Sequence, residues 1–149
     1  MKITEALIAE HSIFLAVFDQ IEKALPSLST PMEIRTMAQV VEGMLTEHAK
    51  TETDLAYLAL DHALANKGRL DRMHQEHHEI DGRLNKVHAA STCSEGRRLL
   101  QGALSAAREH FRAEEKGVFP LIEKTLEPAT LVDLGTAWLK RNVGTNSKK

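Results

Sequence analysis

Two His-x-x-x-Glu pairs stand out in this 149-residue sequence, His48 with Glu52 and His110 with Glu114. On an α-helix, a spacing of four residues stacks the imidazole and the carboxylate on one face. These two side-chain types together suit iron or manganese, and zinc less specifically. The pairs therefore predict metal binding, provided that the two helices face each other.

A further histidine, His11 or His77, precedes each pair at a similar distance along the chain. The second half of the sequence thus repeats the pattern of the first. All four histidines occupy inward-facing positions of helical apolar patterns, so we expect them to converge with the two glutamates at one level inside a bundle. Unpaired buried carboxylates would cost several kcal/mol each. Two metal ions about 3.5–4 Å apart, bridged by Glu52 and Glu114, would satisfy all six side chains.

Four segments with apolar residues at alternating three- and four-residue intervals must position these side chains. We expect helices over about 7–25, 31–60, 70–87 and 100–121, with the inward-facing pattern continuing past the glutamates to Leu55 and Leu121. Because no strand pattern competes, the sequence predicts an all-α protein, an antiparallel up-down-up-down four-helix bundle.

The length predicts a single domain. We expect the bundle domain to cover residues 1–141. Within it, a shorter apolar segment at 131–139 predicts a short extra C-terminal helix packed on the bundle. Residues 142–149 are expected to form a flexible tail.

Composition excludes several classes of function. Nineteen Lys and Arg against 21 Asp and Glu give a formal net charge of −2, which lacks the basic footprint of a nucleic-acid-binding protein. No apolar run reaches the ~20 residues of a membrane span, and the first residues lack the apolar stretch of a signal peptide. The single cysteine excludes an internal disulfide and a thiolate zinc site. We expect a cytoplasmic protein that binds neither nucleic acid nor membrane, and its oligomeric state stays open.

Motifs of competing metal and hydrolytic sites are absent from the sequence. Ferritin-like di-iron bundles use Glu-x-x-His, and metalloproteases use His-Glu-x-x-His, and neither pattern occurs. A nucleophile elbow and a glycine-rich phosphate loop are missing too. The His-x-x-x-Glu pairs therefore define a different kind of metal site.

The sequence resembles the hemerythrin-like (HHE cation-binding) family over about residues 4–126. Four motifs carry the resemblance, in order and one in each expected helix. They are Glu10-His11, His48-x-x-x-Glu52, Glu76-His77 and His110-x-x-x-Glu114-Glu115-x-x-Val-Phe-Pro120.

This resemblance implies a non-haem centre of two iron ions (Fe²⁺/Fe³⁺), bridged by two carboxylates and an oxo or hydroxo group, with a position open to a small ligand. His11 and His48 would serve one iron, and His77 with His110 the other. Manganese and zinc remain alternatives to iron.

The sequence departs from the oxygen-carrying hemerythrins on the third helix. Those proteins have His-x-x-x-His there, and Met73 takes the place of the earlier histidine. His74 and His78 have the right spacing but lie one residue out of phase, so we retain His74 as a seventh candidate ligand and expect His78 to be a solvated neighbour. The oxygen carriers also place the last carboxylate five residues after its histidine, which would select Glu115 instead of Glu114.

Several residues near the six candidates have two interpretations. Glu10, Glu76 and Glu115 either accept hydrogen bonds from the ligating imidazoles or are exposed helix charges. Tyr57, five residues past Glu52, could supply a proton to bound oxygen species, but we expect it simply to pack in the core.

Three functions stay open at this point. The protein binds or senses dioxygen, nitric oxide or peroxide at the metal pair, or it is a di-iron oxidase, peroxidase or iron-handling enzyme, or the metal only stabilises the bundle. The sequence leaves open whether the protein is an enzyme.

Overall fold

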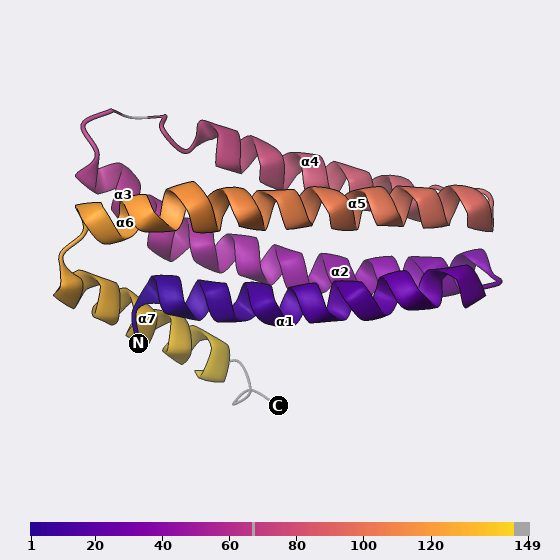
Figure 1. Ribbon diagram of the computed structural model, residues 1–149, viewed down its shortest axis with the longest axis horizontal. Helices are drawn as coiled ribbons and strands as arrows, with labels where there is room; N and C mark the ends of the chain where they lie inside the picture. The colour runs from indigo at the N-terminus through magenta and orange to yellow at the C-terminus, as the bar shows by residue number, and fades with distance from the viewer. Residues whose placement is uncertain (67, 145–149) are drawn as a thin grey trace.

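The computed structural model describes residues 1–66 and 68–144, and this part of the chain contains helices and turns but no strand. The all-helical prediction is confirmed. The long helical stretches of this part of the chain lie side by side, and successive stretches alternate in direction (Figure 1). None of the described helices is both long enough and apolar enough to cross a membrane.

The first hairpin consists of α1 (Ile3–Ala24), a short 3₁₀ turn (Leu25–Ser27) and α2 (Pro31–Glu52). The start of α2 is capped by Thr30 and Glu33. The Thr30 hydroxyl accepts a hydrogen bond from the Glu33 backbone N–H at 3.2 Å, and the Glu33 carboxylate accepts one from the Thr30 N–H at 2.8 Å. This reciprocal box satisfies two N–H groups that a helix start leaves unpaired.

The second hairpin consists of α4 (Asp71–His88) and α5 (Cys93–Ala113). α2 and α5 both continue into further helical segments at the same end of the bundle (Figure 1). From α2 the chain passes through a π-helical turn, η2 (Thr53–Tyr57), into α3 (Leu58–Ala63). From α5 it passes through a second π-helical turn, η3 (Glu114–Val118), into α6 (Phe119–Thr125).

The two π-helical turns correct one sequence expectation. A π-helical turn closes its hydrogen bond over five residues instead of four, so the side chains that follow it are shifted by about one position. Leu55 and Leu121, which were expected to face inward, are only half-buried. Tyr57 and Ile122 are fully buried instead, each at 0% exposure.

Two apolar clusters form the core, one on either side of a polar layer. Along α1, Leu7 belongs to one cluster and Phe14 to the other, with the buried His11 between them. On α4, Met73 and Ile80 flank His77 in the same way. The polar layer therefore crosses the whole bundle and is sealed by hydrophobic side chains at both ends.

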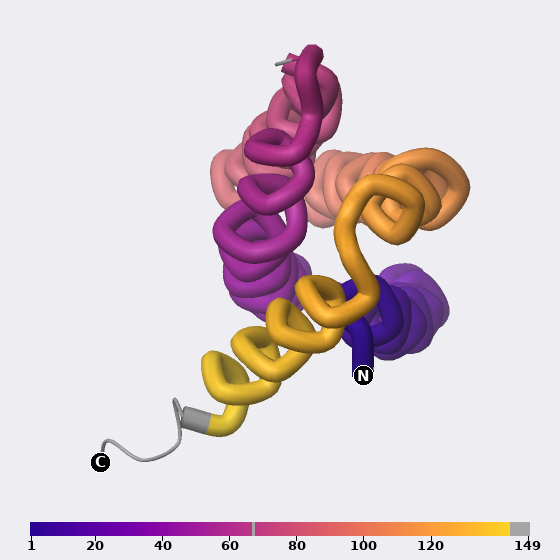
Figure 2. The backbone as a smooth tube through the Cα atoms, turned by 90° about the vertical axis from the view of Figure 1, so that its left-hand side faces the viewer, coloured from indigo at the N-terminus to yellow at the C-terminus, as the bar shows by residue number. Residues whose placement is uncertain are grey.

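The C-terminal helix α7 (Pro128–Gly144) lies against the beginning of α1 (Figure 2). Gly135 allows this close approach, because a Cβ atom there would collide with the Met1 carbonyl oxygen. The helix is longer than the expected segment at 131–139, and residues 142–144 of the expected tail are helical. The remainder of that tail, residues 145–149, lies outside the described residues.

Candidate metal centre

Six of the seven candidate ligands converge in the polar layer. Their ligand atoms form two groups, and within each group these atoms all lie within 4.8 Å of one another. Both groups contain Glu52 and Glu114, which are fully buried. The first group adds His11 and His48, and the second adds His77 and His110.

The Nε2 atoms of the histidines approach the carboxylates and each other closely. His11 Nε2 lies 3.1 Å from His48 Nε2 and 3.3 Å from Glu114 Oε2. In the other group, His110 Nε2 lies 3.0 Å from Glu114 Oε1, and His77 Nε2 lies 3.5 Å from Glu52 Oε2. The donor atoms of both hairpins thus surround one small volume.

Five of these buried atoms lack a hydrogen-bond partner among the described residues. They include both oxygens of Glu52, Oε2 of Glu114 and Nε2 of His77. The fifth is Nε2 of His110, which is close to Glu114 but not aligned for a hydrogen bond. Since buried polar atoms are nearly always paired, and burying charge is costly, a cation bound between these atoms accounts for the arrangement. The nitrogen and carboxylate donors fit the metal pair.

The two central carboxylates have opposite pKa shifts. Burial, and then the charge of Glu114, raise the pKa of Glu52 well above its usual range. Burial also works against ionisation of Glu114, but the close imidazole nitrogens of His11 and His110 outweigh it and hold its pKa well below the usual range. Two adjacent buried carboxyls cannot both ionise at low cost. Without a cation, Glu52 therefore holds a proton and Glu114 carries the charge.

Three histidines are held by carboxylates from a neighbouring helix. In each pair the imidazole Nδ1–H donates to a glutamate, which leaves Nε2 directed at the centre. Of the two interpretations of these glutamates, the structure therefore supports hydrogen bonding to the imidazoles over exposed helix charges. The pairs are His48 with Glu10 at 3.0 Å, His110 with Glu76 at 2.8 Å and His11 with Glu115 at 2.9 Å.

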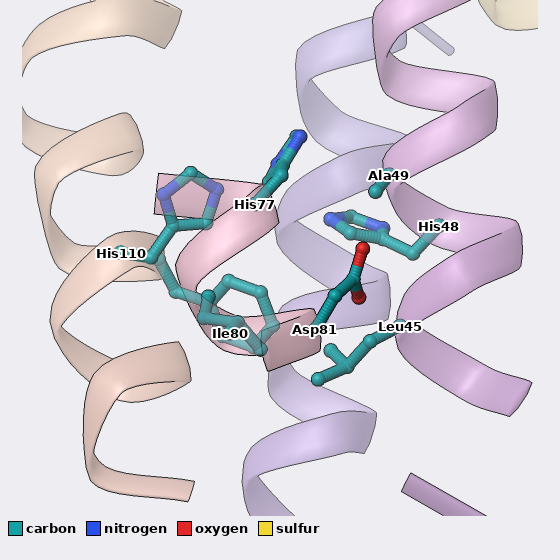
Figure 3. Close-up of a pocket in the computed structure, with 8 residues that line it drawn as sticks. Leu45, His48, Ala49, His77, Ile80, Asp81 and His110 are labelled. Atoms are coloured by element: carbon teal, nitrogen blue, oxygen red, sulfur yellow. The ribbon is translucent and has the colours of Figure 1, made fainter. Parts of the chain in front are cut away.

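A cavity of about 20 Å³ adjoins the donor atoms between α2, α4 and α5. Figure 3 shows His48, His77 and His110 around it. Leu45 and Ile80 contribute apolar walls. This volume is enough for about one water-sized molecule, so a small ligand fits beside three of the four histidines.

The hemerythrin HHE cation binding domain family matches residues 2–126, a range that contains both donor groups. The chain belongs to this family. Neither a curated protein nor a solved structure matches the chain significantly. As in the family description, the histidine and glutamate clusters of this HHE domain are compatible with cation binding.

The seventh candidate ligand of the HHE domain, His74, lies outside both donor groups. Met73 takes the buried position on that turn of α4. The His74 ring instead packs against the Tyr57 ring in a T-shaped arrangement, with centroids 5.4 Å apart. His74 and His78 both line a hollow on the surface beside His77. Both histidines lie one residue away from the inward-facing positions of α4, and their side chains therefore lie at the edge of the centre.

Tyr57 was expected only to pack in the core, but in this HHE domain it also contacts two of the candidate ligands. Its hydroxyl donates a hydrogen bond to Glu114 Oε1, and its ring stacks on His77 with centroids 5.9 Å apart. Burial, and then the charges of Glu52 and Glu114, raise its pKa, so the hydroxyl keeps its proton. α-Helical periodicity contains no signal for this position, because η2 is what turns Tyr57 inward.

Proposed function

We propose that this HHE domain holds a carboxylate-bridged pair of iron ions and binds or senses dioxygen or a related small ligand, such as nitric oxide or peroxide. The observation that carries the proposal is that two donor groups share the same two buried carboxylates. When bound, a di-ferrous pair supplies the electrons that small oxygen and nitrogen ligands require. The net charge of −2 favours such a small ligand over a polyanion.

The residues divide between the two ions as the donor groups do. His11 and His48 would hold one ion, His77 and His110 the other, and Glu52 with Glu114 would bridge them, together with an oxo or hydroxo group. Nitrogen and carboxylate donors without thiolate favour iron or manganese over zinc. Two imidazole nitrogens and two carboxylate oxygens for each ion would leave coordination positions open to a small ligand, as in other non-haem iron sites.

The surrounding residues prepare the site for such a ligand. Glu10, Glu76 and Glu115 orient three imidazoles. Apolar side chains above and below the polar layer limit water access. The Tyr57 hydroxyl holds a proton next to Glu114, within the site.

A second candidate function is a di-iron oxidase or peroxidase, with iron handling as a related role. The buried Tyr57 hydroxyl favours it, because reduction of dioxygen or peroxide consumes protons and this group places one beside a bridging carboxylate. General acid groups of this kind act over hydrogen-bond distances.

Anaerobic reconstitution with ferrous iron, followed by metal analysis and visible spectroscopy during exposure to oxygen, tests both candidates. A band that appears with oxygen and disappears on its removal supports reversible binding. Multiple turnovers of oxygen or peroxide support an enzyme. A content of less than about one metal ion per chain would contradict both functions.

His77→Ala is expected to lower the metal content far more than His78→Ala. His77 contributes a ligand atom to one donor group, whereas His78 lies outside both groups. We expect loss of about one of two ions in the first variant and no measurable loss in the second, by metal analysis after dialysis. Equal effects of the two substitutions would show that His77 is not a ligand.

A further inference from the structure

The metal centre lacks one contact that its internal symmetry predicts. Three of its four histidines donate Nδ1–H to a glutamate, and among the described residues His77 alone has no such partner. His77 is also the most open of the four. Its side chain is 14% exposed, against 0–2% for the other three.

The position of the missing partner follows from the repeat. Glu10 and Glu76 are equivalent in the two halves, because each directly precedes a histidine of the centre. Glu115 directly follows the bridging glutamate of the second half, and the equivalent residue after the bridging glutamate of the first half is Thr53. By this equivalence, a glutamate at residue 53 would complete the set of four acceptors.

Thr53 lies where such an acceptor would be needed. It is the first residue of η2, directly after Glu52, just as Glu115 follows Glu114 in η3. Thr53 and His77 line the same surface hollow, whose other lining residues are mostly polar. The threonine side chain is shorter than that of glutamate and has no carboxylate to accept the Nδ1 proton of His77. The hollow therefore gives solvent a route to His77.

We infer that Thr53 makes the ion at His77 and His110 the more weakly bound and more readily exchanged of the two ions. Metal and small ligands enter and leave the centre on this side. This inference rests on the proposed metal pair. A carboxylate partner fixes the orientation of a ligating imidazole and raises its basicity, and losing one typically costs 10–100-fold in metal affinity. The ion at His11 and His48, both of which have such partners, is retained longer.

Titration of the metal-free protein with Co²⁺, whose visible absorption depends on its ligands, tests the inference. We expect two binding steps whose dissociation constants differ by about 10–100-fold. Thr53→Glu should tighten the second step by a similar factor, slow the release of that ion to a chelator and leave the first step unchanged. Glu115→Thr should weaken the first step instead, because it removes the partner of His11.

Thr53→Asp is the matched control, because it adds the same charge on a shorter side chain. If Thr53→Asp tightened the second step as much as Thr53→Glu, the effect would be one of general electrostatics, and the positioning role of residue 53 would be wrong. Two equal binding steps in the unmodified protein would overturn the inference but leave the metal pair intact. Failure of every form to bind Co²⁺, with helical content retained by circular dichroism, would instead overturn the proposed function.

Discussion

Stripping the metal from the loaded protein is expected to lower its midpoint of thermal unfolding by about 10 °C. A ligand present at about 1,000 times its dissociation constant stabilises the folded state by about 4.1 kcal/mol. In a domain of roughly 150 residues, each kcal/mol shifts the midpoint by about 2–4 °C. The structural reason is the set of buried, unpartnered oxygen and nitrogen atoms of Glu52, Glu114, His77 and His110, which a cation would satisfy.

Differential scanning calorimetry with and without a chelator, before and after Fe²⁺ or Mn²⁺ is restored anaerobically, measures this shift. His11→Ala should reduce the shift, because it removes a nitrogen from one donor group. A midpoint that does not respond to chelator in a preparation shown to contain metal would contradict a bound pair at this layer.

Glu52→Gln is expected to stabilise the metal-free protein by roughly 1–2 kcal/mol at pH 7, as substitutions of strained functional groups commonly do, and to abolish binding of the second ion. Glu52 is fully buried beside the charged Glu114. Glutamine keeps its shape, carries no charge and offers Glu114 an N–H donor. A neutral amide cannot serve as an anionic bridge between two cations, so metal affinity is lost as stability is gained.

The sign of the pH dependence separates this explanation from a general packing effect. The pKa of Glu52 is raised in the folded state, chiefly by burial, so folding favours its protonated form. The stability that this group contributes is complete below the unfolded pKa of about 4.3 and is lost as pH rises from there towards the folded pKa. The advantage of Glu52→Gln should therefore be large at pH 7 and fade towards pH 4.

Urea unfolding of both metal-free proteins at several pH values measures this difference, and metal analysis measures the number of bound ions. Glu47→Gln is the control, because Glu47 is an exposed glutamate on the same helix. An equal gain at all pH values, or full retention of two ions by Glu52→Gln, would be inconsistent with the roles given to Glu52.

A comparison of Glu52 with Glu10 shows how two glutamates have different functions in one layer. Glu52 has no exposed surface and no aligned partner, so its side chain is costly in the metal-free protein. Glu10 has a side chain 18% exposed and accepts a hydrogen bond from His48. In the proposed centre the buried glutamate would bind metal, and the half-buried one orients an imidazole at little cost.

The sequence by itself determined the helical class and the six convergent residues. The inward-facing positions of His11, His48, His77 and His110, and the His-x-x-x-Glu spacing, are local properties of a 3.6-residue helix. Such properties can be read without knowing how the helices pack, and for that reason they correctly placed Met73, and not His74, on the buried face of α4.

Only the tertiary structure decided how those helices meet. Local periodicity cannot reveal the π-helical turns, which bring Tyr57 to Glu114. It also cannot choose between exposed charges and the hydrogen bonds that join Glu10, Glu76 and Glu115 to histidines on other helices, because these depend on the axial offset and rotation of one helix against another. The absence of a fourth acceptor at Thr53 follows only from the pattern of the other three hydrogen bonds.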